Sequence, residues 1–575
     1  MNVIRFKEAK CKNCYKCVRV CDVKAIAVKN EQAQIMNDHC ILCGHCLAAC
    51  PQNAKSLVSD IDRVKDFLKS GLKTVISIAP SFAGIMDYKK PGQLVAALKR
   101  LGFYQVRETA EGAAYVTAEY IKLLEEGRMD NVITTCCPSV NDLMEIYYPE
   151  LTDSMAPVVS PMVAHGRLLK KELGSDIRVV FLGPCIAKKR EAENDLRVQG
   201  AVDAVLNFAE LEKWLAEEGI DLKTLDELPF DNKNPEINRL YPVNTGVINA
   251  VLASRVKEKG YQKLAVDGVR NCMDFLESMK KGEIHNVFVE MNTCVGGCIN
   301  GPAVERKEEK TSYFKRKLDM EAGIEKIPAE IVPLEETGIN LSKIFVNRSF
   351  HDELPSEEKI RETLAKIGKT DKSHELNCGA CGYPTCRDKA IAVCQGKAEL
   401  TMCIPYMHEK AQSMANIVLD TTPNIIIVVD SDMKILEFSR GAEMVFGKSK
   451  QEAIGMYLFE FIDHRDFDEV LNSQSKLVAK RVSYQEYDIT TLQTIVYVKE
   501  INGVLGVFQD ISNEAEKNRQ AYKLKMDTIE MAQRVIDKQM MVAQEIAGLL
   551  GETTAETKVT LTKLRDMIVS DGEFN

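Results

Sequence analysis

Along residues 57–300, apolar runs typical of buried strands alternate with segments that have helical spacing of apolar residues. This pattern predicts an α/β domain. The apolar runs VISIAP (75–80) and RVVFLGP (178–184) predict buried strands, while GQLVAALKRLG and TAEYIKLLEEG have helical spacing. In such domains the loops that follow the strands carry the functional groups. We therefore expect a site where these strands end.

The pattern changes at about residue 412, where cysteine disappears and hairpin signals begin. The runs NIIIVVD and KILEFS flank a polar turn, and the amphipathic stretch GAEMVFGKSKQEAIG follows them. Three further strands are predicted at SYQEYDI, TIVYVKE and VLGVFQD, the last two joined by Ile501-Asn502-Gly503. This order of strands and short helices resembles a PAS domain. We see no haem or flavin ligand in it, which favours a dimerising transmission module.

The segment from 514 to 550 predicts a long helix. Apolar residues recur there every seven positions, at Tyr522, Ile529, Ile536, Ala543 and Leu550. Lys525 and Gln539 interrupt the second set of core positions. The expected coiled coil is therefore modest, and no kinase or phosphatase signature follows it.

Length, composition and net charge limit the classes of protein to which this chain can belong. With 575 residues, 45% hydrophobic and 28% charged, the chain is expected to form three to five globular domains. The net charge of −9 argues against general nucleic-acid binding, and the apolar runs are too short to span a bilayer. With no leader visible, the 19 cysteines indicate metal ligands in a reduced, cytoplasmic protein rather than disulfides.

The N-terminus repeats one cysteine pattern twice. The spacing C-x2-C-x2-C-x3-C occurs first at Cys11, Cys14, Cys17 and Cys21, and again at Cys40, Cys43, Cys46 and Cys50, before Pro51. This is the pattern of bacterial two-cluster ferredoxins, in which each fourth cysteine binds the other cluster. One [4Fe–4S] cluster is expected on Cys11, Cys14, Cys17 and Cys50, the other on Cys40, Cys43, Cys46 and Cys21. Two zinc sites are the alternative, and the neighbouring His39 and His45 are interpreted as bystanders.

Three later segments place cysteines beside glycine or proline: ITTCCPSV (Cys136, Cys137), LGPCIAKKRE (Cys185) and MNTCVGGCING (Cys294, Cys298). Glycine lets the backbone approach a bulky inorganic cluster. Four thiolates on one centre indicate an iron–sulfur cluster or zinc.

These three segments, in this order, resemble the signature motifs of the [FeFe] hydrogenases. The resemblance implies an H-cluster, in which a [4Fe–4S] cluster is joined to a two-iron centre carrying CO, cyanide and a dithiolate. Its ligands would be Cys137, Cys185, Cys294 and Cys298, with Cys298 as the bridge. Lys188 matches the lysine that holds an iron-bound cyanide, and Cys136 matches the thiol that relays protons.

Other positions are assigned by the same resemblance. Ala79, Pro80 and Ser81 match a loop that packs against the two-iron centre, and Pro184 precedes a ligand. Glu119 and Ser160 are further candidate catalytic residues.

The chain departs from the family in two places. On the proton route, Val116 stands where a second glutamate is usual and Ala156 where a serine is usual, and neither side chain can carry a proton. In the pocket, Gly183 and Asn292 replace methionines, and Gly301-Pro302-Ala303 replaces a triple glycine. An altered surrounding shell tunes potential and reactivity.

The segment NCGACGYPTC begins another cysteine group, with Cys378, Cys381, Cys386 and Cys403. Its C-x2-C-x4-C-x16-C spacing resembles the small [4Fe–4S] domain of several anaerobic redox proteins, with a zinc knuckle as the alternative. Cys394 and Cys272 are interpreted as packing residues. The preceding PSEEKIRETLAKIG predicts a capped helix.

The expected fold class is therefore multidomain, α/β and α+β. The domains are a two-[4Fe–4S] ferredoxin-like domain (1–56), a hydrogenase H-cluster domain (57–354), a small [4Fe–4S] domain (355–411), a PAS domain (412–513) and a helical coiled-coil signalling tail (514–575). The implied cofactors are the H-cluster and three further [4Fe–4S] clusters.

Three functions are compatible with these motifs. The favoured one is a slow sensory [FeFe] hydrogenase that relays H2 or redox state through the PAS domain and tail to a kinase or phosphatase regulator. The second is an ordinary hydrogenase coupled to a ferredoxin-type electron carrier, and the third is a non-catalytic hydrogenase-like iron–sulfur scaffold. Expected partners are H2, protons, a ferredoxin-type carrier and a second copy of the chain, with neither nucleic acid nor membrane.

Overall fold

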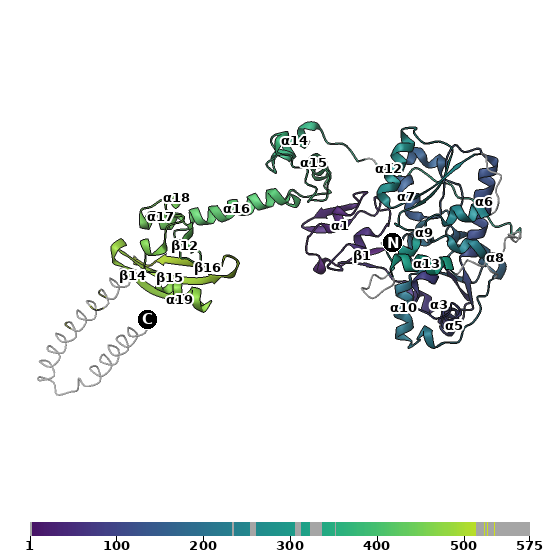
Figure 1. Ribbon diagram of the computed structural model, residues 1–575, viewed down its shortest axis with the longest axis horizontal. Helices are drawn as coiled ribbons and strands as arrows, with labels where there is room; N and C mark the ends of the chain where they lie inside the picture. The colour runs from purple at the N-terminus through teal and green to yellow at the C-terminus, as the bar shows by residue number, and fades with distance from the viewer. Residues whose placement is uncertain are drawn as a thin grey trace, which may run out of the picture. The chain divides into compact units, whose positions relative to one another are not determined.

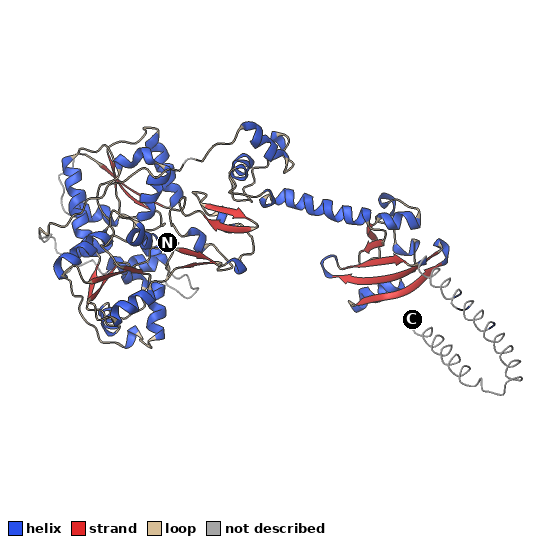
Figure 2. Ribbon diagram, turned by 180° about the vertical axis from the view of Figure 1, so that it is seen from behind, coloured by secondary structure: helices blue, strands red, loops and turns tan. Residues whose placement is uncertain are grey.

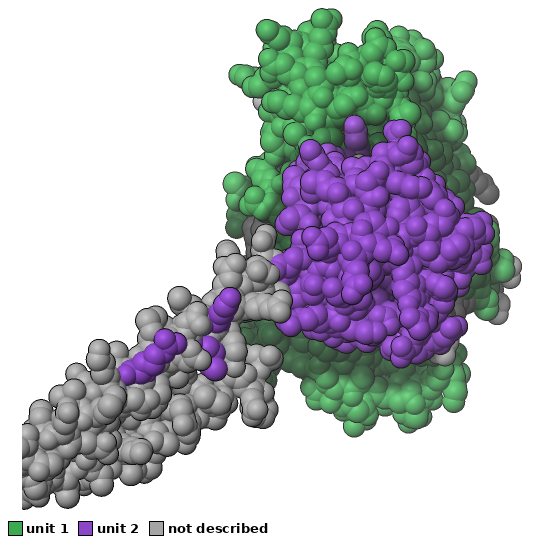
Figure 3. Space-filling model, turned by 90° about the vertical axis from the view of Figure 1, so that its left-hand side faces the viewer, with its two compact units in different colours: residues 1–407 green, residues 408–575 purple. Residues whose placement is uncertain are grey.

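The computed structural model describes residues 3–232, 235–253, 260–304, 312–322, 336–350 and 352–512, together with residues 523, 526 and 534. The chain divides into two compact units, residues 1–407 and 408–575, which Figure 3 shows in green and purple. The predicted coiled-coil tail lies outside the described residues, apart from those three positions. Among the described residues, no helix is long and apolar enough to cross a membrane.

The first unit begins with two small antiparallel pairs of strands, β1 with β4 and β2 with β3. The cysteine-bearing turns lie between these strands and two one-turn helices. The elements are β1 (Ile4–Phe6), α1 (Lys16–Arg19), β2 (Ile26–Lys29), β3 (Gln32–Ile35), α2 (His45–Ala48) and β4 (Lys55–Leu57).

Two parallel sheets form the centre of the following α/β domain. One has the order β6-β5-β8-β9 and the other β10-β11-β7. Figure 2 shows these strands in red with helices in blue around them. The strands are β5 (Thr74–Ile78), β6 (Gln105–Glu108), β7 (Val132–Ile133), β8 (Arg178–Leu182), β9 (Ala204–Leu206), β10 (Gln262–Asp267) and β11 (Val287–Asn292).

The helices of this domain pack on the sheets with their apolar faces. They are α3 (Ile61–Lys69), α4 (Phe82–Ile85), α5 (Gly92–Arg100), α6 (Ala110–Glu126), α7 (Pro138–Tyr147), α8 (Pro161–Leu173), α9 (Ala187–Asn194), α10 (Phe208–Glu217), α11 (Gly246–Ala253), α12 (Val269–Lys280) and α13 (Tyr313–Ala322). The predicted strands at 75–80 and 178–184 are confirmed as β5 and β8, and the two predicted helices as α5 and α6.

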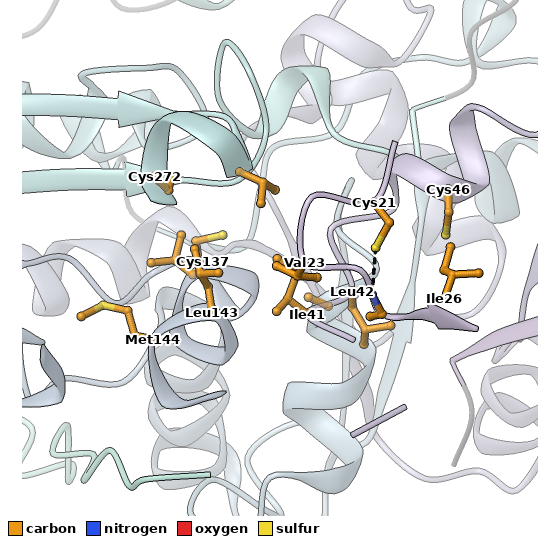
Figure 4. Packing of buried hydrophobic residues seen from close by; sticks show 14 of the residues in the cluster. Cys21, Val23, Ile26, Ile41, Leu42, Cys46, Cys137, Leu143, Met144 and Cys272 are labelled. Carbon is orange, nitrogen blue, oxygen red and sulfur yellow. Dashed lines mark hydrogen bonds between the residues drawn. The ribbon is translucent and has the colours of Figure 1, made fainter. Parts of the chain in front are cut away.

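One buried apolar cluster joins the ferredoxin-like part to the α/β domain. Val23, Ile41 and Leu42 pack in the same cluster as Leu143 of α7 and the Cys137 side chain. Figure 4 shows Val23, Ile41 and Leu42 between Cys137 on one side and Cys21 and Cys46 on the other. Two groups of cysteines are therefore held to one another by a continuous core.

The small domain near residue 380 consists of α14 (Glu357–Ala365), α15 (Cys386–Cys394) and their connecting loops. The Ser356 hydroxyl accepts a hydrogen bond from the Lys359 N–H, which confirms the predicted cap of α14. Thr385 and Asp388 form a capping box at the start of α15. Helix α16 (Ile404–Thr421) follows and continues into the second unit (Figure 1).

The second unit contains a five-stranded antiparallel sheet of order β13-β12-β16-β15-β14. Its elements are β12 (Ile425–Val429), β13 (Ile435–Phe438), α17 (Arg440–Phe446), α18 (Lys450–Ala453), α19 (Arg465–Ser473), β14 (Lys476–Tyr484), β15 (Ile489–Val498) and β16 (Gly503–Asp510). Buried aromatic residues, among them Phe438, Phe467 and Phe508, form its core.

One predicted strand of this unit is wrong. SYQEYDI (483–489) is mostly the turn between β14 and β15, and β14 itself covers 476–484. The prediction from alternating apolar and polar residues was wrong there for two reasons. Most β14 side chains are at least partly exposed, and the pairing with β15 is irregular between Leu477 and Lys480. The Ile501-Asn502-Gly503 turn is confirmed, with Asn502 at φ 45°.

Candidate metal centres

One cavity in the first unit is lined by all five cysteines of the three later motifs. It encloses about 430 Å³ of space, and its lining includes Cys137, Cys185, Cys294 and Cys298. Cys136, Lys188, Pro184 and Asn292 line the same cavity. Residues from three distant motifs therefore meet at one place.

Each cysteine is positioned by the end of a secondary-structure element. Cys137 precedes α7, whose first residue is Pro138, and Cys185 lies between β8 and α9. Cys294 follows β11, and Cys298 is the first residue of a short 3-10 helix, Cys298–Asn300. These loops follow parallel strands, so the ligands meet at the expected end of the sheets.

The cavity is lined by thiols that the surrounding protein shields from bulk water. Burial raises the pKa of Cys185 to about 11 and that of Cys294 well above its usual value. The neighbouring thiols raise the pKa of Cys294 further. A thiophilic cation would reverse this cost, because metal binding releases the thiol protons. The donor set of four thiols thus fits a cluster of iron and sulfide.

Lys188 belongs to a buried ionic network beside the cavity. Its Nζ donates to Glu191 Oε2 at 2.6 Å and to the Cys136 carbonyl at 3.2 Å. The Ser160 hydroxyl, at the start of α8, donates to the same Glu191 oxygen at 3.0 Å. Lys343 Nζ lies 3.7 Å from the other Glu191 oxygen. The ammonium of Lys188 is thereby held at the cavity wall.

The structure shows one residue next to Cys136 that the motifs did not indicate. The hydroxyl of Tyr120, a fully buried residue of α6, lies 3.2 Å from Cys136 Sγ and accepts a hydrogen bond from the Thr135 N–H at 3.0 Å. The Tyr120 proton can therefore point to the sulfur. Burial raises the pKa of Cys136 to about 12, and the Tyr120 hydrogen bond opposes this rise. No spacing rule signals such a contact.

The residues of the predicted proton route lie in different surroundings. Val116 and Ala156 are fully buried in one apolar cluster with Tyr120. Glu119 is partly exposed on α6, where its carboxylate pairs with Lys122 at 2.6 Å. The role of Glu119 in proton transfer stays a prediction.

The predicted packing loop lies at the end of β5. The N–H of Ala79 donates to the Leu182 carbonyl at 2.8 Å, which ties the loop to β8. Pro80 is buried, and the buried Ser81 hydroxyl has no hydrogen-bond partner among the described residues. None of Ala79, Pro80, Ser81, Ser160 and Glu119 is among the residues that line the cavity.

Gly183, just before Pro184, has its side-chain space filled by another residue. A Cβ at position 183 would lie 2.6 Å from the Phe181 ring and 3.2 Å from Ala79 Cβ. We expect Gly183→Met to destabilise the protein by about 1–3 kcal/mol because of overpacking. We expect Phe181→Ala to relieve part of this cost, so that the two effects are not additive in thermal unfolding. Full additivity would show that the ring does not block this position.

Glu290 is a buried carboxyl of β11 two residues before Asn292. Its Oε2 accepts from the N–H groups of Val247 and Ile248, and its Oε1 lies 3.4 Å from Asn292 Nδ2. Burial raises the pKa of Glu290 to about 7, although these N–H groups lower it.

This raised pKa predicts a pH dependence of stability. Between its usual value of 4.5 and about 7, the folded protein binds more protons at Glu290 than the unfolded chain does. The free energy of unfolding should therefore decrease as pH rises through this window. Glu290→Gln is expected to flatten the slope, measured by thermal unfolding at about pH 5 and about pH 8. Equal slopes in both proteins would contradict this assignment.

The ferredoxin-like part has two cysteine sites. A cavity of about 350 Å³ is lined by Cys11, Cys14, Cys17 and Cys50, which is the first predicted ligand set. Cys43 belongs to the other group: burial raises its pKa, and so do Cys21, Cys46 and Cys40. The structure thus groups the cysteines as the exchange of fourth ligands requires. Cys43 also lines the cavity of Cys137 and Cys298.

The two histidines in this part have neighbours other than cysteine. His39 packs on Phe350 with ring centroids 3.6 Å apart, and His45 lies 3.8 Å from Asp22. In the part of the chain that the structure describes, no three His, Cys, Asp or Glu side chains converge closely enough to hold a single metal ion.

The small domain gathers its cysteines around a buried lysine. Burial raises the pKa of Cys381, and so do the nearby Cys403 and Cys378. Lys389 is only 2% exposed, and its Nζ donates to the Leu400 carbonyl at 2.9 Å. Burial lowers the pKa of Lys389, while Cys403, Cys381 and Cys386 raise it, so the ammonium lies among these thiols.

The thiols of the two cysteines interpreted as packing residues contact other protein groups, and their packing role stays a prediction. Cys272 is fully buried and donates to the Asn292 carbonyl at 3.4 Å. The Cys394 thiol contacts the Thr363 hydroxyl at 3.2 Å, between α15 and α14.

Comparison with protein families identifies four domains along the chain. The model of the iron only hydrogenase large subunit, C-terminal domain, matches residues 72–302. A 4Fe-4S dicluster domain matches 3–51, an Fe-S cluster family 375–405 and the PAS fold 416–511. These matches confirm the predicted fold classes, while the exact domain boundaries stay predictions.

Curated proteins and solved structures give similar results. Iron hydrogenase 1 of Clostridium pasteurianum is 26% identical over 46% of this chain and 56% of its own length. The nuclear prelamin A recognition factor of Xenopus laevis is 23% identical over 51% of this chain and 83% of its own. A Chlamydomonas reinhardtii [FeFe]-hydrogenase structure has a TM-score of 0.42 and 18% identity, covering 51% of this chain and all of its own. The chain thus spans little more than half the length of the clostridial protein.

Proposed function

We propose, from the match of residues 72–302 to the model of the iron only hydrogenase large subunit, C-terminal domain, that this protein is a sensory [FeFe] hydrogenase. It binds and splits H2 reversibly at an H-cluster with low turnover. The observation that carries the proposal is the cavity shared by Cys137, Cys185, Cys294 and Cys298, with Lys188 in its wall. When bound, the H-cluster supplies the vacant iron and the base that H2 cleavage needs.

The residues of the chain hold the cofactor and control its surroundings. Cys137, Cys185, Cys294 and Cys298 would be the ligands, with Cys298 as the bridge between the two halves. Lys188, which Glu191 orients, would supply a charged hydrogen-bond donor to a cyanide of the bound cofactor. Pro138, Pro184 and Pro302 supply apolar walls that limit water in the cavity.

The surroundings of Cys136 support low turnover. Cys136 would hold the proton that enters or leaves the cofactor. Its nearest side-chain partner is the hydroxyl of Tyr120, whose pKa is raised well above 10 by burial. Such a hydroxyl stays protonated at neutral pH and neither releases nor takes up a proton readily, and Val116 and Ala156 add no polar group. Proton exchange at this cysteine should therefore be slow.

The remaining domains fit a relay of the H2 or redox state. The PAS domain and the helical tail would form a homodimer and act on a separate kinase or phosphatase regulator. The two ferredoxin-type sites would exchange electrons with a ferredoxin-type carrier. A sensor needs only a change of state, so slow chemistry is compatible with this role.

The infrared spectrum of the anaerobically matured protein tests the proposal. We expect sharp bands in the CO and cyanide stretching region that shift under H2, together with slow H2 turnover. Turnover at the speed of a fermentative hydrogenase would overturn the sensory role and favour the ordinary, ferredoxin-coupled enzyme.

A second candidate is a non-catalytic iron–sulfur scaffold. It is favoured by the similarity to the nuclear prelamin A recognition factor and to a cytosolic Fe-S cluster assembly factor from Xenopus tropicalis, which is 22% identical over 48% of this chain and 72% of its own. In this case the matured protein would bind iron and sulfide but show no CO or cyanide bands. The presence of Cys136, Lys188 and Cys298 in one cavity favours the hydrogenase.

A further inference from the structure

The small domain that carries Cys378 and Cys403 packs directly on the ferredoxin-like part. The N–H of Val28 in β2 donates to the Lys397 carbonyl at 2.9 Å. Arg19 Nη1 donates to the Ala380 carbonyl at 3.1 Å. These bonds join the loops around the small-domain cysteines to the strands and helix of the ferredoxin-like part.

Gly382 allows the small domain to approach the ferredoxin-like part closely. It has φ +94°, and a Cβ there would lie 2.8 Å from Val18 Cγ1 and 3.1 Å from the Arg19 backbone nitrogen. Tyr383 and Met402 are buried in the same apolar cluster as Val18 and Val28. Because any side chain at position 382 would separate the two parts, the interface depends on this glycine.

Two side chains at this interface, Tyr383 and Lys24, are each close enough to Cys21 and Cys381 to feel their charge. Burial raises the pKa of Tyr383 to about 12, and the charges of Cys381 and Cys21 raise it further. Burial lowers the pKa of Lys24, while Cys21 and Cys381 are both near enough to oppose this. The hydrogen bond from Arg19, two residues before Cys21, to the carbonyl of Ala380, next to Cys381, brings the same two cysteine loops together.

Cys21 belongs to the group with Cys40, Cys43 and Cys46, and Cys43 lines the cavity of the candidate H-cluster. This one ferredoxin-type site thus has the cavity on one side, at Cys43, and the small domain on the other, at Cys21. The site of Cys11, Cys14, Cys17 and Cys50 lines a separate cavity. A route from Cys43 to Cys381 does not need to pass through it.

The buried ammonium of Lys389 favours the reduced state of a cluster in the small domain. An ammonium among cluster thiolates stabilises the reduced, more negative cluster. The domain also leads into α16, because Cys403 immediately precedes Ile404, the first residue of that helix. An electron held at Cys403 is therefore stored at the start of the helix that leads to the PAS domain.

We propose that the small domain is a side branch of the electron route, which receives electrons from the Cys21–Cys40–Cys43–Cys46 site directly and holds them beside Lys389. This inference rests on the proposed function, and it names the path by which H2 is reported. Oxidation of one H2 gives two protons and two electrons. Each [4Fe–4S]²⁺ cluster accepts one electron, so one H2 reduces the small-domain cluster and one ferredoxin-type cluster.

Electron paramagnetic resonance of the full-length, matured protein tests the branch. Cys14→Ala removes a ligand of the separate site, and Cys43→Ala removes one at the junction. Under H2 we expect the small-domain cluster to be reduced as fast in the Cys14→Ala variant as in wild type. In the Cys43→Ala variant we expect its reduction to be at least about tenfold slower. Cys378→Ala identifies the signal by its loss. An equal loss in Cys14→Ala would overturn the branch.

Chemical reduction separates failure of the branch from failure of the proposed function. Dithionite should give the small-domain signal in both variants, which shows that the domain is assembled. If H2 reduces no cluster in wild type, the proposed function fails. The branch is then decided by spin coupling in the dithionite-reduced protein, which should persist in Cys14→Ala and disappear in Cys43→Ala. Coupling unchanged in Cys43→Ala would overturn the branch alone.

A redox titration with dithionite, without H2, tests Lys389. We expect Lys389→Met to lower the reduced-to-oxidised ratio of the small-domain cluster about tenfold at a fixed potential, which equals about 59 mV for one electron. Lys389→Arg keeps the charge and should stay within about threefold of wild type. An unchanged midpoint in Lys389→Met would show that this lysine does not hold the electron.

Discussion

Replacement of Cys298 by alanine is expected to abolish H2 turnover and to remove the CO and cyanide bands from the infrared spectrum. Cys298 lines the cavity that it shares with Cys137, Cys185 and Cys294, and in the proposed function it would bridge the two halves of the H-cluster. Without the bridging thiolate the two-iron half has no covalent bond to the protein. The signals of the other iron–sulfur clusters should remain, because their cysteines lie in other sites.

Cys272→Ala is the matched control for this variant. Cys272 is a fully buried residue of α12, but its thiol donates to the Asn292 carbonyl and does not line the cavity. We expect this variant to keep the infrared bands. Bands that persist in Cys298→Ala, or that disappear equally in both variants, would contradict the assignment of the bridge.

The double variant Val116→Glu with Ala156→Ser is expected to raise H2 oxidation about 100-fold, because a positioned acid–base group contributes roughly 10²–10⁴-fold. Val116 lies one helical turn before Tyr120 on α6, so the introduced carboxyl would lie on the same face as the hydroxyl that contacts Cys136. The site is fully buried and apolar. The carboxyl should therefore cost about 1–3 kcal/mol of stability.

The control variant Val116→Gln with Ala156→Ser distinguishes an effect of side-chain size from an effect of proton transfer. The amide has nearly the same size as the carboxyl but cannot exchange a proton in this role. We expect this control to lose similar stability and to gain no activity, in dye-coupled H2 oxidation and thermal unfolding. An unchanged rate in a folded Val116→Glu, Ala156→Ser protein would contradict a blocked proton route and support the ordinary hydrogenase.

The cysteine groups could be predicted from sequence because cluster ligation constrains local spacing. The doubled C-x2-C-x2-C-x3-C pattern implied an exchange of fourth ligands, and the cavity lined by Cys11 and Cys50 agrees with it. The strands predicted at 75–80 and 178–184, the second of which leads to Cys185, followed from apolar runs, since buried parallel strands have few polar positions. The strand predicted at 483–489 failed because β14 lies on an exposed edge without clear alternation.

The contacts that individual side chains make in the folded protein could not be predicted in this way. No periodicity indicates that the Tyr120 hydroxyl lies 3.2 Å from Cys136 Sγ, or that the Phe181 ring occupies the space next to Gly183. Glu119 was assigned from its register in a motif, yet its carboxylate pairs with Lys122. Each of these depends on how a helix is rotated against a sheet, which is decided by packing over the whole core.

The sequence by itself determined which elements form and which cysteines belong together, because helix and strand periods and ligand spacing are local properties of the chain. Only the tertiary structure decided which group faces Cys136, which ferredoxin-type site adjoins the cavity and which site adjoins the small domain. The last two relations join residues more than 100 positions apart, such as Cys43 with Cys298 in one cavity and Val28 with Lys397 in one hydrogen bond. Such pairs are brought together by burial of shared apolar surface, which acts across the folded molecule and leaves no short-range signal.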